Sequence, residues 1–379
     1  MKILLLGEYS GVFSELAHGL KNTGHDVSLI NDGDNYKSFY SDYPIVYPTK
    51  RNGLFGKILH AISYRLGIDG IVSFWKQWHS LKLHLKSYDI VQIINPVVFS
   101  GWGALANLII LRFLRRNNNK VFLSVLGFDY YQMVWFERNF NPSGYYSPSL
   151  NQFIRPDFAF KYRYCLFYKT LNDYAIKISQ KIIPGLLEYK YCYDWTGKTT
   201  NIIPFPISKE KIGKPLSLKD TKTIIIFHGW QKGKEKFKGN DVFDRVVNRV
   251  AALYGKRVKY LVVQKVPYDE YITLYNNCHI FIDQLYSLDK GMNGLLGMAA
   301  GKVVFAGLST DSLNAYPSYN GEEIGVSTTI DENLLYEKFC KTIDSLDLME
   351  KISKNAIEFV KKNHETSIVV KMYLDAWTH

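Results

Sequence analysis

A glycine-rich turn leads into a helix of small residues in the stretch HIFIDQLYSLDKGMNGLLGMAAGKVVFAG, residues 279–307. Apolar runs at 280–282 and 303–307 border it and predict two parallel strands with the helix between them. The helix begins at Gly291 to Asn293, so free backbone N–H groups and the positive end of the helix dipole face one point. This arrangement predicts a site for an anion such as phosphate. Tight packing is the alternative reason for such a turn.

Lysines border a second loop, in the sequence HGWQKGKEKFKGND of residues 228–241. The loop follows a predicted strand and precedes a predicted helix over 242–253. The ammonium groups of Lys232 and Lys238 would clamp a diphosphate above the helix start, because charge-assisted hydrogen bonds add to the field of the helix. The alternative is a solvated basic loop, since the same loop carries two further lysines.

The first residues predict a strand, a glycine turn and an amphipathic helix. Residues 2–6 are apolar, the turn GEYSG occupies 7–11, the helix ends at Gly24, and a second strand is predicted at 26–30. The turn of such a unit opens at the carboxyl end of the sheet, where ligands bind. GEYSG lacks the GxGxxG fingerprint of dinucleotide binding, which argues against a dehydrogenase.

Asp129 is a candidate for acid–base chemistry. It follows Gly127-Phe128 after a predicted strand over 121–126, which places it at the carboxyl end of a strand beside the 7–11 turn. A carboxylate there could position or deprotonate a sugar hydroxyl. Capping of the next helix is an equally supported role.

Length and composition set limits on the elements that position these residues. A chain of 379 residues is too long for one ordinary core and predicts two domains. Hydrophobic residues make up 47% of it, which excludes a disordered protein, and no apolar run reaches the ~20 residues of a membrane-spanning helix. The cysteines are widely spaced, so neither a disulfide framework nor a zinc site is predicted, and a reducing cytoplasm fits. They are Cys165, Cys192, Cys278 and Cys340.

The net charge of +12, from 47 basic and 35 acidic residues, implies an anionic partner such as nucleic acid, acidic lipid or a phosphorylated substrate. The stretch Arg51 to Lys86 holds six basic residues against Asp69 alone, interleaved with apolar residues that include Trp75 and Trp78. Basic residues beside an apolar stripe suit the surface of an anionic membrane. The alternative is a pair of ordinary surface helices with both tryptophans in the core.

Strands and helices alternate in both halves of the chain, which predicts an α/β protein of two doubly wound, Rossmann-like parallel-sheet domains. A proline-bounded, charged segment near 205–220 marks the boundary. We expect domains over 1–205 and 206–365, and terminal helices over 332–354 and 357–377. The strands predicted for the second half are 223–227, 260–263, 279–283 and 303–306.

Residues 223–307 resemble the nucleotide-sugar half of GT-B-fold glycosyltransferases, in particular the large retaining family (group 1, family 4-like) that builds bacterial surface polysaccharides. That family has a Gly-rich loop with a basic residue and then Lys-Gly-x-Asp, which Lys232 and KGND at 238–241 match. Its Ala-Met-Ala-x-Gly helix end is matched by GMAAG at 297–301, with glycine for the first alanine, and Gly291 matches its loop glycine.

The resemblance extends beyond this segment. The turn at 7–11 resembles the glycine loop that faces donor and acceptor in the family. The segment 366–377 resembles its tail helix, so the resemblance implies that residues 366–379 pack back on the first domain. It also implies GT-B architecture, in which two Rossmann-like domains face each other across a cleft.

One departure concerns two glutamates that the family separates by seven residues, one near the transferred sugar and one on the nucleotide ribose. The matching positions hold Leu288 and Leu296. Leucine supplies no charge or acceptor, so neither role can be filled there. Asp289 and Asp283 are the nearby carboxylates that could substitute, but a shift of one residue in a loop changes where a side chain points.

The resemblance implies a hexosyltransferase-type enzyme that moves a sugar from a nucleoside-diphosphate sugar to a lipid-linked or growing glycan acceptor in surface polysaccharide synthesis, with retention of configuration. The lysines and loop amides would stabilise the diphosphate leaving group, and neither metal nor cofactor is expected. The expected residues are Asp129, Lys232, Lys238 and Asp289 in catalysis, Gly229, Gly239, Val266, Pro267, Gly291, Met292 and Asn293 at the donor, and Gly7, Glu8, Ser10 and Gly11 in an acceptor-side loop.

The expected partners are a nucleotide-sugar donor, a glycan or polyprenyl-diphosphate-linked acceptor, and an anionic membrane surface that contacts residues 51–86. We expect a cytoplasmic protein, peripheral on the inner face of the plasma membrane. No recognised nucleic-acid motif accompanies the charge, so nucleic acid is not an expected partner. The alternative function is that of a catalytically degenerate protein of this fold that binds nucleotide, sugar or a partner enzyme. The two leucines favour it, and the retained lysines oppose it.

Overall fold

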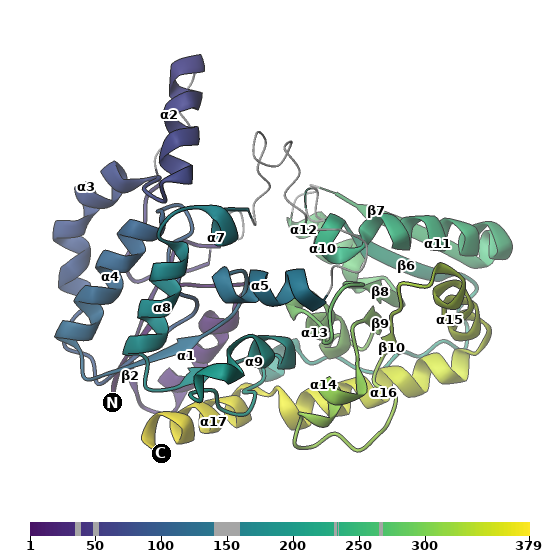
Figure 1. The fold of residues 1–379 in the computed structure, drawn as a ribbon. Helices are drawn as coiled ribbons and strands as arrows, with labels where there is room; N and C mark the ends of the chain where they lie inside the picture. The colour runs from purple at the N-terminus through teal and green to yellow at the C-terminus, as the bar shows by residue number, and fades with distance from the viewer. Residues whose placement is uncertain (35–38, 48–52, 140–159, 231–232, 234, 265–267) are drawn as a thin grey trace. The chain divides into compact units, whose positions relative to one another are not determined.

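The computed structural model describes residues 1–34, 39–47, 53–139, 160–230, 233, 235–264 and 268–379. The chain forms two compact units (Figure 1). Unit 1 comprises Met1–Ile203 together with Val369–His379, and unit 2 comprises Pro204–Ile368. Unit 2 is therefore continuous in sequence, whereas unit 1 is completed by a segment that follows unit 2.

The strands of unit 1 are β1 (Lys2–Leu6), β2 (Asp26–Ile30), β3 (Ile90–Ile93), β4 (Lys120–Ser124) and β5 (Ile182–Ile183). They form one parallel sheet in the order β2-β1-β3-β4-β5. β1 and β3 are mostly apolar and, apart from Lys2, buried throughout, as a sheet covered on both faces requires; Gln92 is the polar residue of β3. The strand order reverses at β1, so the loops after β1 and β3 open at the point where ligands bind to such sheets.

The helices described in unit 1 are α1 (Val12–Asn22), α2 (Leu54–Arg65), α3 (Ile71–Leu81), α4 (Ala104–Asn117), α5 (Tyr130–Asn139), α7 (Phe160–Tyr164), α8 (Tyr168–Ile178), α9 (Leu187–Tyr193) and most of α17 (Thr366–Thr378). Helix α4 packs between α3 and α8. The indole of Trp377 in α17 is buried and donates to Gln92 Oε1 in β3 at 2.8 Å. Residues far apart in sequence thus share one core.

The strands of unit 2 are β6 (Ile224–Gly229), β7 (Val258–Val263), β8 (Ile280–Ile282), β9 (Val303–Ala306) and β10 (Val326–Ser327). They form a second parallel sheet in the order β10-β9-β8-β6-β7. The order reverses at β6, between its neighbours β7 and β8. The loops that follow β6 and β8 therefore lie at the ligand-binding position of this sheet.

The helices described in unit 2 are α10 (Glu235–Lys238), α11 (Asn240–Tyr254), α12 (Tyr268–Asn276), α13 (Met292–Ala299), α14 (Thr310–Asn314), α15 (Glu332–Asp344) and α16 (Leu346–Asn363). Helix α11 packs against α15, and α13 packs against α16. The rings of Phe305 in β9 and Phe339 in α15 stack with their centroids 3.8 Å apart. This core fixes the ends of β6 and β8.

The predicted ranges of the terminal helices, 332–354 and 357–377, were wrong. The structure has three helices there, because breaks occur at Ser345 and at His364. Ser345 is extended, and its side chain accepts a hydrogen bond from Leu348 N, so it caps a new helix. The apolar spacing continues across both breaks, and periodicity alone therefore cannot locate them.

The basic stretch forms two helices, α2 and α3; Arg51 lies outside the described residues. The two tryptophans differ in burial. Trp78 is half-buried and lies 5.1 Å from the Phe74 ring and 5.3 Å from the Phe113 ring, centroid to centroid. Trp75 is exposed. The alternative interpretation, two ordinary surface helices with both tryptophans in the core, therefore holds for Trp78 only.

Candidate functional site

The carboxylate of Asp283 connects the two loops at the reversal point of unit 2. Asp283 follows β8, and its Oδ2 accepts a hydrogen bond from Gly291 N at 2.7 Å. Its Oδ1 lies 3.5 Å from Nζ of Lys238, which follows β6. The predicted residues Lys238 and Gly291, 53 positions apart by their numbers, thus meet at one buried carboxylate.

Exposure decides which of these groups a ligand can reach. The Asp283 side chain is 1% exposed, whereas that of Lys238 is 15% exposed. Gly291 and Asn293 are half-buried, and Met292 is buried. Lys238 and the first turn of α13 therefore form the accessible side of the cluster, with Asp283 behind them. The first-turn amides have no helical carbonyl partner, so they favour an anion on that side.

Two glycines make the close approach of these loops possible. A Cβ on Gly294 would lie 2.6 Å from Asp283 Oδ2, and a Cβ on Gly239 would lie 2.6 Å from Leu285 Cβ. Gly239 also has a φ of 66°, the left-handed conformation that glycine adopts without strain. These positions hold the acid against α13 and turn the chain from Lys238 into α11.

His228, the last histidine before the lysine loop, is fully buried at the end of β6. Its Nε2 lies 2.8 Å from Asn240 Nδ2, and its Nδ1 lies 2.6 Å from the Tyr260 hydroxyl. Burial, and the charge of Lys238 nearby, lower the pKa of His228 to about 3. The imidazole is therefore neutral at pH 7 and ties β6 to α11, which fixes the base of the loop.

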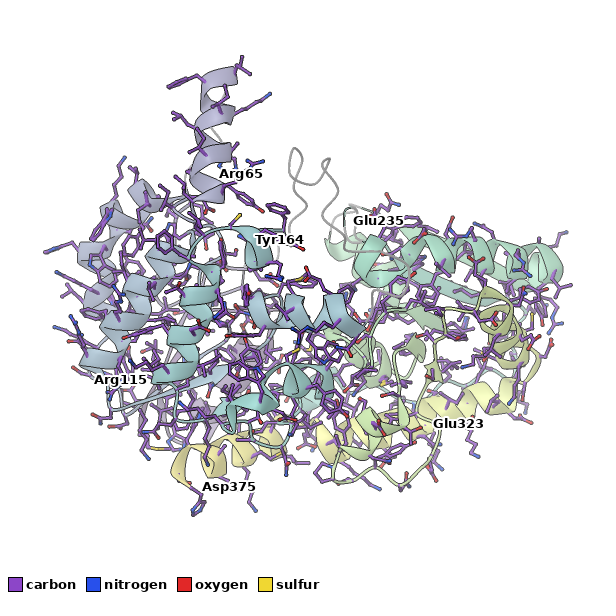
Figure 2. All side chains as sticks on the ribbon, in the orientation of Figure 1. Arg65, Arg115, Tyr164, Glu235, Glu323 and Asp375 are labelled. Atoms are coloured by element: carbon purple, nitrogen blue, oxygen red, sulfur yellow. The ribbon has the colours of Figure 1, made fainter. Side chains whose placement is uncertain are left out.

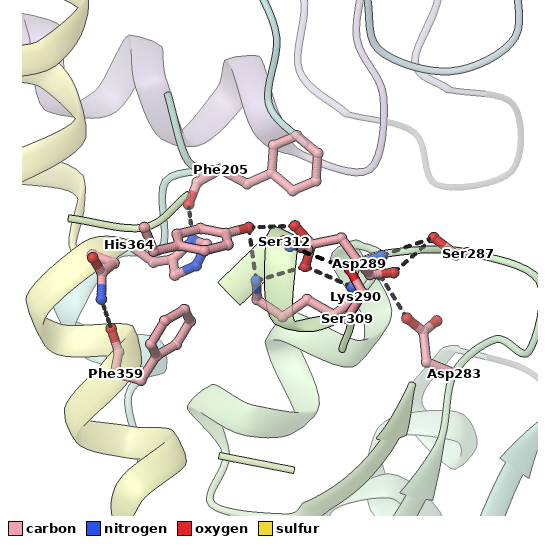
Figure 3. Close-up of polar contacts among 12 residues, drawn as sticks. Phe205, Asp283, Ser287, Asp289, Lys290, Ser309, Ser312, Phe359 and His364 are labelled. Atoms are coloured by element: carbon pink, nitrogen blue, oxygen red, sulfur yellow. Dashed lines mark hydrogen bonds and ion pairs between the residues drawn. The ribbon is translucent and has the colours of Figure 1, made fainter. Parts of the chain in front are cut away.

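Asp289, a predicted catalytic residue, belongs to a closed buried cluster (Figure 3). Its Oδ1 lies 3.0 Å from Lys290 Nζ, and its Oδ2 accepts a hydrogen bond from the Tyr316 hydroxyl at 2.8 Å. Asp289 and Lys290 are 0% and 1% exposed. Burial lowers the pKa of Lys290, while Asp289 opposes the shift. In this arrangement the Asp289 carboxylate is used inside the protein, beneath the turn that carries Gly291.

The remaining predicted donor residues have separate placements. Gly229 ends β6, next to Trp230, whose indole donates to Glu235 Oε1 at 3.1 Å. Leu288 and Leu296 are half-buried. Three predicted residues lie outside the described part of the chain, namely Lys232, Val266 and Pro267.

In unit 1 the turn after β1 carries its own anion. Glu8 is buried, and its carboxylate accepts hydrogen bonds from Gly11 N at 3.0 Å and from Ser14 N at 2.8 Å. Burial raises the pKa of Glu8, and the hydrogen bonds from Ser14 oppose that shift. The side chain thus fills the N-terminus of α1. Gly7 and Gly11 have positive φ values of 91° and 87°, which the tight turn requires, and Ser10 also has positive φ.

Asp129 caps the next helix. Its Oδ1 accepts from Gln132 N at 2.9 Å, and its Oδ2 accepts from the Tyr193 hydroxyl at 2.7 Å. The residue is 0% exposed, and burial raises its pKa to about 6. The two predicted loops do meet, since a Cβ on Gly127 would lie 3.3 Å from the Tyr9 ring. The capping role, left open by the sequence, is the one this geometry displays.

Sequence reasoning singled out neither Lys290 nor His228. A lysine is rarely buried, so Lys290 was not distinguished from surface lysines. Its position directly before the turn at Gly291 was the available signal. His228 stands at the end of a predicted strand and ahead of a lysine loop, where a polar residue in the core of a sheet marks the ligand-binding edge.

Among the described residues, no group of His, Cys, Asp and Glu is placed to hold a metal ion. In the same part of the chain, no helix is both long enough and apolar enough to cross a membrane.

No protein-family model and no curated protein sequence matches this chain. Solved structures match it over nearly its whole length. The Anabaena protein HepE, in a complex with UDP and glucose, has a TM-score of 0.58 at 12% identity and covers 99% of this chain and 98% of its own. Sucrose-phosphate synthase from Thermosynechococcus elongatus has 0.59 at 12%, over 100% and 98%. The lipopolysaccharide outer core galactosyltransferase WaaB has 0.55 at 12%, over 99% of each chain.

At these identities the likeness shows the fold. Two parallel five-stranded α/β sheets of Rossmann-like order match the structures of GT-B glycosyltransferases, as the sequence predicted. HepE has been solved with UDP-glucose as well. The likeness therefore establishes a GT-B fold. Whether this chain transfers a sugar has to be argued from its own residues.

Proposed function

We propose that the protein is a glycosyltransferase that transfers a hexose from a nucleoside-diphosphate sugar to a lipid-linked or growing glycan acceptor in surface polysaccharide synthesis, with retention of configuration. One observation carries the proposal. Lys238 and the turn at Gly291 come together at Asp283, on the strand-order reversal where α/β sheets bind ligands.

The chemistry of that cluster suits a diphosphate. The Lys238 ammonium has three N–H donors, of which Asp283 at 3.5 Å can engage one, and a phosphate can engage the others. The amides of Met292 and Asn293 would face the same phosphate from the helix start. Fixed donors aimed at a leaving diphosphate stabilise the charge that develops as the glycosidic bond breaks. The cluster can therefore both bind the donor and lower the barrier to transfer.

Lys232, Val266 and Pro267 remain parts of the proposal by resemblance, Lys232 as the second cation on the diphosphate and the other two as backbone contacts to the base. Asp129 and the turn at 7–11 remain the proposed acceptor side. Since Asp129 is buried and caps α5, it would act by positioning the loops at the end of β4, with any proton transfer requiring that loop to open.

The alternative function is that of a binding protein of the same fold. Leu288 and Leu296 favour it, because the resemblance places glutamates there and a leucine cannot contact a ribose or a sugar hydroxyl by hydrogen bonding. The cation and the helix start oppose it, because they serve the leaving group. We propose a slow or donor-selective transferase in preference to an inactive one.

The proposed acceptor sets the location. A polyprenyl-diphosphate-linked acceptor stays in a membrane, so we propose that the protein works peripherally on the inner face of the plasma membrane. Because HepE has been solved with UDP-glucose, a uridine-diphosphate sugar is the first donor to test.

The experiment measures release of nucleoside diphosphate from UDP-, GDP- and ADP-sugars and CMP release from CMP-sugars, with extracts of the native acceptor present. The variant is Lys238→Ala, and the matched control is Lys259→Ala, which removes an exposed lysine of the same unit. Loss of one charge-assisted contact is worth roughly 1.5–3 kcal/mol, so Lys238→Ala should weaken donor binding about ten-fold or more. Lys259→Ala should behave as the wild type.

Two results separate the candidate functions. Calorimetric binding that depends on Lys238, together with release no faster than in Lys238→Ala for every donor, would leave the binding protein. Donor affinity that is unchanged in Lys238→Ala would remove the diphosphate clamp and with it the basis of both proposals.

A further inference from the structure

Helix α2 turns an apolar face to solvent. Leu54 is 77% exposed, Phe55 is 75%, and Ile58 and Ile62 are about half exposed at 48% and 50%. Figure 2 shows the side chains of α2 standing away from the rest of unit 1, with Arg65 labelled at its base. Monomeric proteins seldom leave adjacent large apolar side chains in water, because each would stabilise the fold if it were buried.

The exposed residues share one side of the helix. At about 100° per residue, Leu54, Ile58, Ile62 and Phe55 fall within a sector of roughly 100°, and Leu66 at the helix end extends it. Gly56, on the opposite side, is buried. The apolar sector is therefore exposed; Arg65 falls within it, and Lys57 and His60 on the other sides of α2 are exposed as well.

A second exposed apolar segment, a hundred residues further along the chain, lies beside the C-terminal end of α2. Leu166 N donates to Arg65 O at 2.9 Å, so the turn before α8 lies beside the end of α2. Leu166 and Phe167 are 55% and 42% exposed. Phe167 has a φ of 66°, a left-handed conformation that is unusual for a phenylalanine, and it starts α8 without a side-chain cap. The fold thus holds an exposed aromatic ring at a backbone conformation that asparagine or glycine would adopt with less strain.

The charged residues of the sequence segment that contains α2 are almost all basic. Between residues 53 and 86 the basic residues are Lys57, Arg65, Lys76, Lys82 and Lys86. The one acidic residue of that segment, Asp69, is buried at 8% exposure. The basic residues of α2 itself are Lys57 and Arg65. An apolar helix face that carries two basic residues, with no exposed carboxylate in the segment, attracts a surface that is apolar inside and anionic outside.

We propose that Leu54, Phe55, Ile58, Ile62, Leu66, Leu166 and Phe167 form the α2 face, which inserts into the interface of an anionic lipid bilayer. The apolar side chains enter the boundary between headgroups and acyl chains, while Lys57 contacts the headgroups. This proposal names the surface for the peripheral location proposed above. Vesicle binding is measured without donor or acceptor, so its outcome is independent of sugar transfer.

The experiment is co-sedimentation of the full chain with vesicles of phosphatidylcholine alone and with vesicles that also contain phosphatidylglycerol. Wild-type protein should bind the anionic vesicles several-fold more tightly, and part of that preference should disappear at high salt. The double variant Leu54→Ser, Phe55→Ser should lower the partition coefficient by about ten-fold or more, since two large apolar groups no longer leave water. The control Leu253→Ser changes a leucine of unit 2 that is 62% exposed in a helix, and it should bind as wild type.

Phe167→Asn is the variant that separates lipid binding from folding. Asparagine tolerates the left-handed conformation and is a favoured helix N-cap, so thermal stability should be kept or raised. Lipid binding should still fall several-fold, because the ring is gone. The control Ile330→Asn, at a residue of unit 2 that is 66% exposed, should not change lipid binding.

Three outcomes would overturn the proposal. In the first, the wild-type protein does not bind anionic vesicles. In the second, Phe167→Asn and the double serine variant bind vesicles as tightly as wild type does. In the third, the main effect of the variants is to dissociate a dimer in sedimentation velocity. The last outcome would make the face an interface between copies of the chain.

Discussion

Asp129 is held between a helix start and a tyrosine, and its titration should be visible in the stability of unit 1. Burial raises its pKa from 3.8 to about 6, so the folded state binds the proton more tightly than the unfolded chain does. The stabilising effect of that proton is complete below the unfolded pKa and is lost as the pH rises through about 6. A shift of about two units corresponds to about 3 kcal/mol.

Asp129→Asn should therefore flatten the fall in stability between pH 4 and pH 7, since asparagine keeps the cap without a charge. Denaturant unfolding of both proteins across this range checks the expectation. Parallel profiles for wild type and variant would show that Asp129 does not titrate in this window.

Leu296 offers a test in the direction of gained binding. If the resemblance places this residue on the ribose, Leu296→Glu supplies a charge-assisted acceptor worth roughly 1.5–3 kcal/mol, and nucleotide affinity should rise about ten-fold. Leu296→Gln, which is neutral, should give a smaller gain. Calorimetry with the nucleotide that binds the wild type most tightly measures both. If the affinity rises in neither variant, Leu296 does not lie at the nucleotide ribose.

At the scale of elements, the turn before α13 depends on Gly294. A Cβ there would lie 2.6 Å from Asp283 Oδ2, so Gly294→Ala should displace the carboxylate from Gly291 and Lys238. Donor affinity should fall about ten-fold, because the pre-arranged donors lose their support. Gly213→Ala is the matched control, since its Cβ would meet its nearest atoms at an ordinary 3.5 Å. Equal affinity in the two variants would separate the turn from the binding site.

The elements also show what can be predicted from a sequence. The strands predicted at 2–6, 26–30, 121–126, 223–227, 260–263, 279–283 and 303–306 and the helix that follows Gly291 lie within a few residues of observed elements, because buried apolar runs and glycine turns are local features. The short β10 was not predicted, since two residues carry no period. The predicted bounds of the helices now seen as α15 and α16 were wrong, because the helix break at Ser345 is set by a side-chain cap and apolar periodicity does not detect caps.

The contacts of the site could not be predicted in the same way. Lys238 lies near Asp283 because β6 and β8 are neighbours in the sheet. No local sequence pattern predicts the order of strands in a sheet. The burial of Asp289 with Lys290 and Tyr316 depends on a tyrosine 26 positions beyond the lysine. Lys238, Asp283 and Gly291 could be named from the sequence, whereas their contacts, and the buried Lys290 and His228, became visible only in the fold.

At the scale of the whole molecule, unit 1 depends on Trp377. Its indole fills a buried position under β3 and β4 and satisfies Gln92 Oε1. Trp377→Leu should leave a cavity and an unpaired buried amide oxygen, with a cost of about 2–4 kcal/mol. Hydrogen exchange should accelerate in β3 and β4 while β6 and β8 stay protected. Equal acceleration in both sheets would show that the two units unfold together.

The place of residues 369–379 in unit 1 has a consequence for synthesis on the ribosome. Residues 1–203 emerge first, yet the segment that covers β3 and β4 follows only after all of unit 2. At ordinary rates of translation this interval lasts roughly ten to thirty seconds. During that time the nascent first unit exposes an apolar sheet face, while the second can fold as soon as its own chain is complete. Chaperones that shield apolar surface should therefore engage the nascent chain through its first half, and release should follow the arrival of Trp377.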